Sequence, residues 1–111
     1  MAQNFQRTLN RNITLLASPQ ELRAATTTND AIIGVRCTNT SGVSVDITVY
    51  VKNTSTNYYI IKDAPIPTGG SLELIDGGSK VVLQTGDSVE AYASVASAVD
   101  IILSVVDSIS T

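Results

Sequence analysis

The stretch Val43-Ser-Val-Asp-Ile-Thr-Val-Tyr-Val-Lys52 decides the fold, because its residues alternate between apolar and polar side chains. Successive side chains of a β-strand point to opposite faces, so this alternation predicts a half-buried strand. The face that carries the apolar residues should lie against a core. Five side chains share that face: Val43, Val45, Ile47, Val49 and Val51.

The flanking sequence repeats this pattern. Residues 53–56 form a turn by composition, and residues 57–62 return the chain, which predicts a hairpin. The prolines within residues 64–67 should place that segment at a sheet edge or outside the sheet. Seven to eight strands divided by turns predict an all-β fold, an antiparallel β-sandwich of Ig-like or jelly-roll topology. The other alternating segments are residues 31–38, 71–75, 80–84, 88–95 and 99–107.

The first and last strands of this body carry more specific expectations. Ile33, Val35 and Cys37 alternate with polar residues and should point inward. The closing strand has apolar residues on both faces, including Ile102 and Val106, so we expect it to be central or covered on both sides. Cys37 would then be a small buried hydrophobic residue.

Residues 1–30 lack a clear period and are interpreted as an extended N-terminal arm, with residues 31–111 as the sandwich domain. Residues 20–25 fit a helix or a short strand equally well. Four arginines and two carboxylates make residues 1–36 basic, whereas three lysines and eight carboxylates make residues 37–111 acidic. We expect the arm, through Phe5, Arg7 and Arg11, to contact a neighbouring subunit. Deletion of residues 1–25 should then leave a folded domain that no longer joins an assembly.

The composition argues against most chemistry. The chain has no histidine, a single cysteine and a formal net charge of −3. Histidine is the usual proton carrier near neutral pH, and non-specific nucleic-acid binding needs clustered Lys and Arg. Charged residues make up only 15% of the chain, which suits a protein that lies against copies of itself or against a larger body.

The sequence also bears on the compartment. One cysteine cannot form an internal disulfide, and the polar N-terminus has no apolar signal-peptide region. The longest apolar stretch, residues 91–106, is interrupted by polar residues and is too short to span a bilayer. We therefore expect synthesis in the cytoplasm and no membrane partner.

Glycine and aspartate in the turns suggest ligand loops but do not match them. The Gly-Gly pairs at residues 69–70 and 77–78 lack the spacing and the following helix of a phosphate loop, and they predict hairpin turns. Asp63, Asp76 and Asp87 could share a calcium ion, but their spacing matches no calcium loop. We expect no metal and no cofactor.

Catalytic groups are equally hard to assemble from this sequence. A hydroxyl nucleophile would need Lys52, Lys62 or Lys80 as its base, and no motif links them. Glu73 and Glu90 on adjacent strands could form a glycosidase pair, without further support. The sequence predicts no catalytic residue and no enzyme.

Three tyrosines are the aromatic candidates for binding. Tyr50, Tyr58 and Tyr59 belong to one hairpin, whose outward face would carry Tyr50 and one of the other two. Such a surface is typical of an aromatic platform for sugars or of an anchor at a protein interface. Contact with a neighbouring protein is the favoured interpretation.

Three stretches carry a resemblance to a known class of proteins. They are Lys62-Asp-Ala-Pro-Ile-Pro-Thr-Gly-Gly-Ser-Leu-Glu-Leu74, Lys80-Val-Val-Leu-Gln-Thr-Gly-Asp-Ser-Val89 and Ala93-Ser-Val-Ala-Ser-Ala-Val-Asp100. Together they resemble small β-sandwich virion proteins of tailed bacteriophages, of the capsid decoration or cement type. The likeness extends back through Ile32-Ile-Gly-Val35 and Thr38-Asn-Thr-Ser-Gly42, and covers about residues 24–107.

The resemblance implies a structural component of a virion that is made in the host bacterial cytoplasm and has no catalytic site. We expect a homo-oligomer that docks on the major capsid protein and reinforces the head lattice through repeated contacts. A neck, tail or fibre-attachment subunit is the first alternative, and a glycan-binding module on the virion surface is the second.

Overall fold

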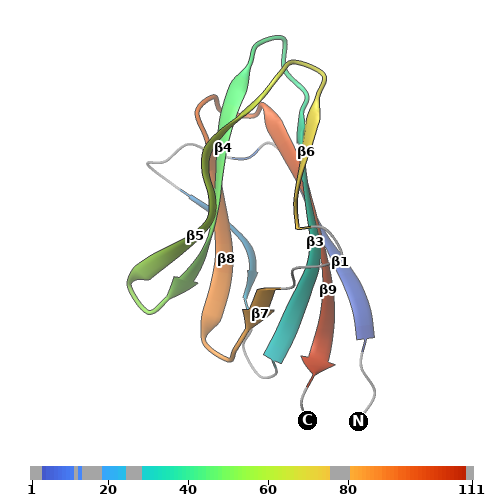
Figure 1. Ribbon diagram of the computed structural model, residues 1–111, viewed down its shortest axis with the longest axis vertical. Helices are drawn as coiled ribbons and strands as arrows, with labels where there is room; N and C mark the ends of the chain where they lie inside the picture. The colour runs from blue at the N-terminus through green and yellow to red at the C-terminus, as the bar shows by residue number, and fades with distance from the viewer. Residues whose placement is uncertain (1–3, 12, 14–18, 25–28, 76–80, 110–111) are drawn as a thin grey trace.

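The computed structural model describes the whole chain except residues 1–3, 12, 14–18, 25–28, 76–80 and 110–111. Its described residues form nine strands and no helix, in two antiparallel sheets packed face to face (Figure 1). The expected all-β sandwich is therefore confirmed. Within these residues, nothing forms a helix that could cross a membrane.

Sheet A has the order β1-β9-β3-β6, and β7 also pairs with β3. β6 lies opposite residues 35–38 of β3, and β7 lies opposite residues 30–32. β6 and β7 therefore lie one after the other along the same edge of β3. The members of sheet A are β1 (Asn4–Asn10), β3 (Asn29–Asn39), β6 (Ser71–Ile75), β7 (Val81–Leu83) and β9 (Val99–Ile109).

Sheet B has the order β2-β8-β4-β5. Its edge strand β5 contains Pro65, which agrees with the edge position expected for that segment. The end of β5 at the β4–β5 hairpin turn lies away from sheet A (Figure 1). The members of sheet B are β2 (Gln20–Ala24), β4 (Val45–Asn53), β5 (Thr56–Ile66) and β8 (Asp87–Ala93).

The strands pair as nested partners counted from the two ends of the series. β1 pairs with β9, β2 with β8, β3 with β6 and β7, and β4 with β5. A long two-stranded ribbon that is rolled into two facing sheets has this pairing, which is the jelly-roll topology. Of the two topologies that the sequence leaves open, the structure has the jelly roll.

The described part of residues 1–30 differs from the expected arm. β1 is hydrogen-bonded along β9 in sheet A, and β2 along β8 in sheet B. Ile13 and Leu22 are buried in the common core, and β3 already begins at Asn29. A rolled ribbon needs outer partners for β8 and β9, and this segment provides both. It is therefore part of the sandwich, and no boundary falls at residue 30.

The core lies between the sheets and follows the alternation of the sequence. Val45, Ile47 and Val49 of β4 are fully buried, as expected, but Val43 is exposed because β4 begins only at Val45. The other large buried side chains come from both sheets and from Ile13, which lies between β1 and β2: Ile13, Ile32, Val35, Ile66, Leu83, Val89, Val99, Ile101 and Leu103.

One inward position was predicted wrongly. Ile32 is fully buried, whereas Ile33, which we expected to face the core, is half-buried. The register between β3 and β9 shifts between Ile32 and Gly34, and such a β-bulge changes which residue faces the core. Beyond the bulge, Val35 and Cys37 point inward as expected.

Asn39 joins the two sheets at one end of the sandwich. Its buried side-chain Nδ2 donates hydrogen bonds to the carbonyl oxygens of Val43 (2.7 Å) and Ile66 (2.9 Å). Its Oδ1 accepts hydrogen bonds from the backbone N–H (2.9 Å) and the hydroxyl (2.7 Å) of Ser41. One side chain of sheet A thereby fixes both the turn after β3 and the end of β5 in sheet B.

An ion pair joins the sheets at a second place. The Nε of Arg23 in β2 donates to Oδ2 of Asp30 in β3 at 2.8 Å. Asp30 is buried, so its carboxylate depends on this cation for compensation. The pair holds the edge strand of sheet B against the central strand β3 of sheet A.

Burial of Cys37 gives a testable dependence of stability on pH. Burial raises the pKa of the Cys37 thiol from 9.0 to about 12. The unfolded chain therefore ionises first, so the stability that the neutral thiol provides is intact below pH 9 and falls as the pH rises toward 12. At about pH 10.5 we expect about 1–2 kcal/mol of extra loss relative to a Cys37→Ala variant. Urea unfolding of both proteins at pH 8 and pH 10.5 measures it, and parallel losses would contradict it.

Candidate contact surfaces

The outer face of sheet B carries a cluster of tyrosines around a buried ring. Tyr50 on β4 is only 3% exposed, although it points away from the core. Its ring lies 5.6 Å from that of Tyr59 on β5, nearly edge-on, and 6.3 Å from that of Tyr92 on β8. Its hydroxyl donates a 2.7 Å hydrogen bond to Oε1 of Glu90. We name these four residues the Tyr50 cluster.

The cluster corrects one expectation about the tyrosines. Tyr50 cannot present its ring to a ligand, because Tyr59 and Tyr92 cover it. Tyr59 is 47% exposed and carries the ammonium of Lys62 at 4.9 Å from its ring centre, a cation–π contact. The sequence did not identify Tyr92 as a neighbour of Tyr50, because the sequence of one strand does not show which residues lie beside it on the adjacent strand.

Tyr58 lies apart from the cluster. It is opposite Val51 in the register, so it shares the side of the sheet that faces inward. It is nevertheless 60% exposed, because the end of the β4–β5 hairpin lies away from sheet A (Figure 1). The sequence predicted Tyr58 and Tyr59 on one hairpin correctly, but the structure places their rings on different sides of it.

Removing the Tyr50 hydroxyl should have a modest, specific effect on stability. Burial, and then the hydrogen bond to Glu90, raise the pKa of Tyr50, so the hydroxyl stays protonated as a donor at neutral pH. A Tyr50→Phe variant should lose about 1–2 kcal/mol of the free energy of unfolding, because a hydrogen bond to a carboxylate is lost. Tyr58→Phe is the control and should unfold at the wild-type urea concentration. Equal midpoints for both variants would contradict the role of this hydrogen bond.

The outer face of sheet A presents exposed apolar residues beside charges. Leu9 on β1 lies directly opposite Ile102 on β9, and the two side chains are 58% and 43% exposed. Across β9 the same row continues to Arg36 on β3 and Glu73 on β6. Nε of Arg36 and Oε1 of Glu73 are 3.5 Å apart in an exposed ion pair. Sequence reasoning missed this row, because only sheet register brings its members together.

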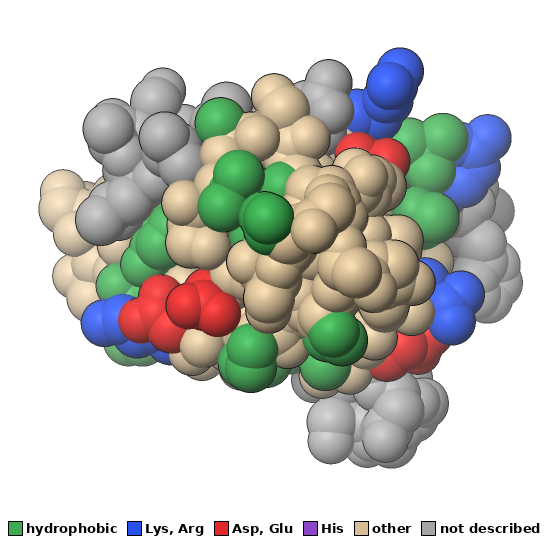
Figure 2. Space-filling view, turned by 90° about the horizontal axis from the view of Figure 1, so that it is seen from above, with side chains coloured by type: hydrophobic (Ala, Val, Ile, Leu, Met, Phe, Trp, Pro, Cys, Tyr) green, Lys and Arg blue, Asp and Glu red, His purple; other side chains and the backbone are tan. Residues whose placement is uncertain are grey.

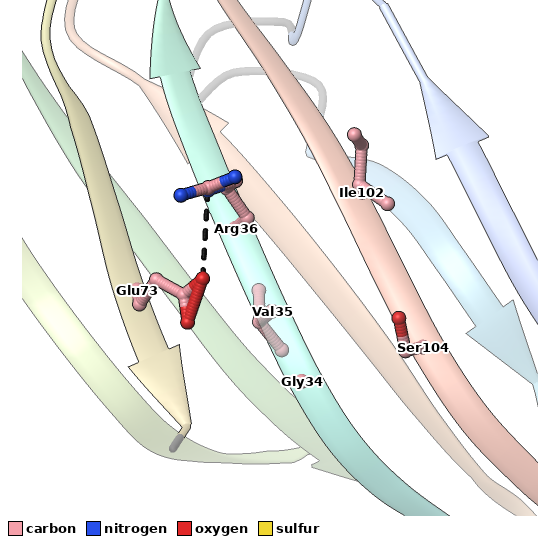
Figure 3. Close-up of a pocket in the computed structure, with 6 residues that line it drawn as sticks. All are labelled: Gly34, Val35, Arg36, Glu73, Ile102 and Ser104. Atoms are coloured by element: carbon pink, nitrogen blue, oxygen red, sulfur yellow. Dashed lines mark ion pairs between the residues drawn. The ribbon is translucent and has the colours of Figure 1, made fainter.

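A hollow lies beside that row. Gly34 on β3 is opposite Ser104 on β9, and the missing side chain leaves a depression of about 220 Å³ (Figure 3). A Cβ added at Gly34 would meet only Ser104, at 3.8 Å, so the space is open above the strand. Leu9 and Ile102 also line a second hollow of about 210 Å³, together with Arg11 and Asp100.

The three residues expected at an arm interface take different places. Arg7 is exposed on β1 opposite Ser104, and Arg11 lines the second hollow. Phe5 pairs with Val106 in the register, and its side chain lies outside the described residues. Arg7 and Arg11 therefore belong to the outer face of sheet A rather than to a separate arm.

Counted over the side chains that the structure describes, the two outer faces carry opposite net charge. On sheet A, Arg7, Arg11 and Arg36 outnumber the carboxylates Glu73 and Asp100 by one. On sheet B, the carboxylates exceed the lysines by two. That face carries Glu21, Asp46, Asp63 and Glu90 together with Lys52 and Lys62. The end of the sandwich between the faces is mostly uncharged (Figure 2).

The candidate chemical groups are not brought together. Glu73 belongs to sheet A and Glu90 to sheet B, so they do not form the facing pair that the sequence allowed. Asp76 and Lys80 lie outside the described residues. Among the residues that the structure does describe, no three His, Cys, Asp or Glu side chains gather as metal ligands.

The described chain is thus a jelly-roll sandwich with a basic, apolar outer face on sheet A and an acidic, tyrosine-bearing outer face on sheet B. A third exposed feature is the hairpin end with Tyr58. No protein-family model, no curated protein and no solved structure matches this chain.

Proposed function

We propose that the protein is a structural subunit of a tailed-bacteriophage virion that decorates the head and reinforces its lattice through repeated protein contacts. The motifs between residues 62 and 100 that resemble phage virion proteins support this function. The jelly roll supports it too, because this architecture builds many viral capsid proteins as well as lectins.

The observation that carries the proposal is the exposed Tyr58 at the projecting hairpin end. Tyr58 is 60% exposed, so most of its surface is open to a partner. Tyrosine is enriched among the residues that dominate interface energetics, because it adds apolar area and a polar tip. We assign this hairpin end to the contact with the capsid protein.

The contact acts through repetition. A single tyrosine-centred contact is weak, but a subunit that is linked to neighbouring bound copies dissociates only when several contacts open together. Reinforcement of the lattice follows, because each bound copy then resists the separation of the capsid subunits beneath it.

Binding to heads prepared without this protein tests the proposal. Wild-type protein should co-sediment with heads and saturate at hundreds of copies, and the Tyr58→Ala variant should lose at least tenfold in affinity. Tyr58→Phe, which keeps the ring, should bind nearly as well. Absence of wild-type binding to heads would overturn the proposed decoration function. Saturation on complete particles at only a few copies would favour the neck, tail or fibre-attachment alternative.

A glycan-binding module is a second candidate, because lectins also use the jelly roll and Tyr59 is 47% exposed. Tyr58 and Tyr59 lie on different sides of the hairpin, so a sugar would meet one ring rather than a platform. A glycan array with wild-type protein and a Tyr59→Ala variant tests this function. A signal that the substitution abolishes would support it, and an array without signal would exclude it for the glycans presented.

A further inference from the structure

We infer that copies of this chain associate face to back, with the outer face of sheet A in one copy against the outer face of sheet B in the next. The inference rests on the proposed function only in taking the chain to be an assembly subunit. It goes further by naming both surfaces and by identifying a second copy as the occupant of the Leu9–Ile102 face.

Charge complementarity selects the occupant. The described side chains of the face with Leu9 and Ile102 have one arginine more than carboxylates, in a chain whose net charge is −3, so its most favourable partner is acidic. The opposite outer face of the same chain meets that requirement. Glu21 and Glu90 lie directly opposite each other there, a like-charge pair that a cation from outside would relieve. Two copies of sheet A facing each other would instead bring basic surfaces together.

Shape and polarity agree with the charges. The hollow between Ile102 and Gly34 accepts a projecting side chain, and it is bordered by the guanidinium of Arg36 (Figure 3). The sheet B face offers Tyr59, the 47% exposed member of the Tyr50 cluster. An aromatic ring beside a guanidinium and two apolar side chains is a favourable contact in both its dispersion and its cation–π components.

The geometry makes the contact heterologous. The two outer faces lie on opposite sides of one sandwich, so a copy that uses its sheet A face still exposes its sheet B face. Repetition of such a contact gives a ring if the rotation closes and a filament if it does not. The hairpin end with Tyr58 takes no part in this contact and stays available in every copy.

A charge-swap experiment tests the inference. Variant one, Arg7→Glu with Arg36→Glu, makes the sheet A face acidic, and variant two, Glu21→Lys with Asp46→Lys, makes the sheet B face basic. All four positions are at the surface, and circular dichroism checks that both variants fold.

At low ionic strength, light scattering should show wild-type oligomers and two monomeric variants. An equimolar mixture of the variants should associate again, because each altered face then meets a complementary one. About 1 M salt should weaken wild-type association, because it shortens the Debye length to about 3 Å.

Several outcomes would overturn the inference. One is a wild-type protein that stays monomeric at low salt. Another is a mixture of folded variants that stays monomeric. A third is variant two associating like wild type, because that result indicates contact between two sheet A faces. The Tyr58→Ala variant should still form oligomers. Oligomers without head binding would therefore reject the proposed function alone, whereas head binding by strictly monomeric protein would reject this inference alone.

Discussion

A chain that lacks residues 1–24 should fail to form a stable sandwich. The deletion removes β1 and β2, and it takes Ile13 and Leu22 out of the core. Each of those side chains contributes about 2–3 kcal/mol through burial, and unpairing the buried Asp30 from Arg23 costs about 3–5 kcal/mol more. The sum is comparable with the whole stability of a typical domain, about 5–15 kcal/mol. This expectation replaces the folded core domain that the arm interpretation predicted.

Circular dichroism with urea unfolding, together with size-exclusion chromatography, measures the effect. The deletion should give no cooperative transition and should promote aggregation, because the edges of β8 and β9 become unpaired. The full-length chain, unfolded under the same conditions, is the reference. A truncated protein with a cooperative transition near the wild-type midpoint would show that the sandwich does not depend on β1 and β2.

An Asn39→Ala variant should lose about 3 kcal/mol of the free energy of unfolding. The substitution removes two hydrogen bonds to main-chain carbonyls and two from Ser41, and it leaves the carbonyl of Ile66 buried without this donor. Asn39→Asp removes only the donor, because aspartate keeps the oxygen that accepts from Ser41. It also places a charge in a buried position. Both variants should therefore be strongly destabilised, for different reasons.

Urea unfolding of these variants beside Asn57→Ala measures the effect. Asn57 is exposed in β5 near the hairpin turn, so its substitution should change the free energy of unfolding by less than about 0.5 kcal/mol. If Asn39→Ala and Asn57→Ala unfold at the same urea concentration, the contact between the sheets through Asn39 does not stabilise the fold.

The fold class was predictable because burial follows local alternation. The burial of Val45, Ile47 and Val49 was predicted correctly from the alternation within one strand. The same holds for the inward residues Ile101 and Leu103 of β9. The bulge near Ile33 was not predictable, because a register shift depends on the partner strand and not on the strand that carries it.

The role of the N-terminal segment could not be predicted for a related reason. Among the side chains of β1 and β2 that the structure describes, only Leu22 lies in the core, and the pairing partners of both strands lie near the opposite end of the sequence. The candidate surfaces show the same limit. The tyrosines were visible as residue types, but the neighbours of Tyr50 and the row through Leu9 and Ile102 come from three or four strands each. Cross-strand neighbours require the register, which one sequence does not specify.

The nested pairing has a consequence for how the chain acquires its structure. Asn4 pairs with Asp107, so sheet A cannot close until nearly the last strand has been synthesised. Contacts of such high sequence separation make folding slow, since a long loop must lose its entropy before the pairing stabilises it. During that interval β3 and β4 have apolar faces without cover, which favours aggregation at high expression. Refolding from urea should therefore be slow and should yield more native protein at low concentration.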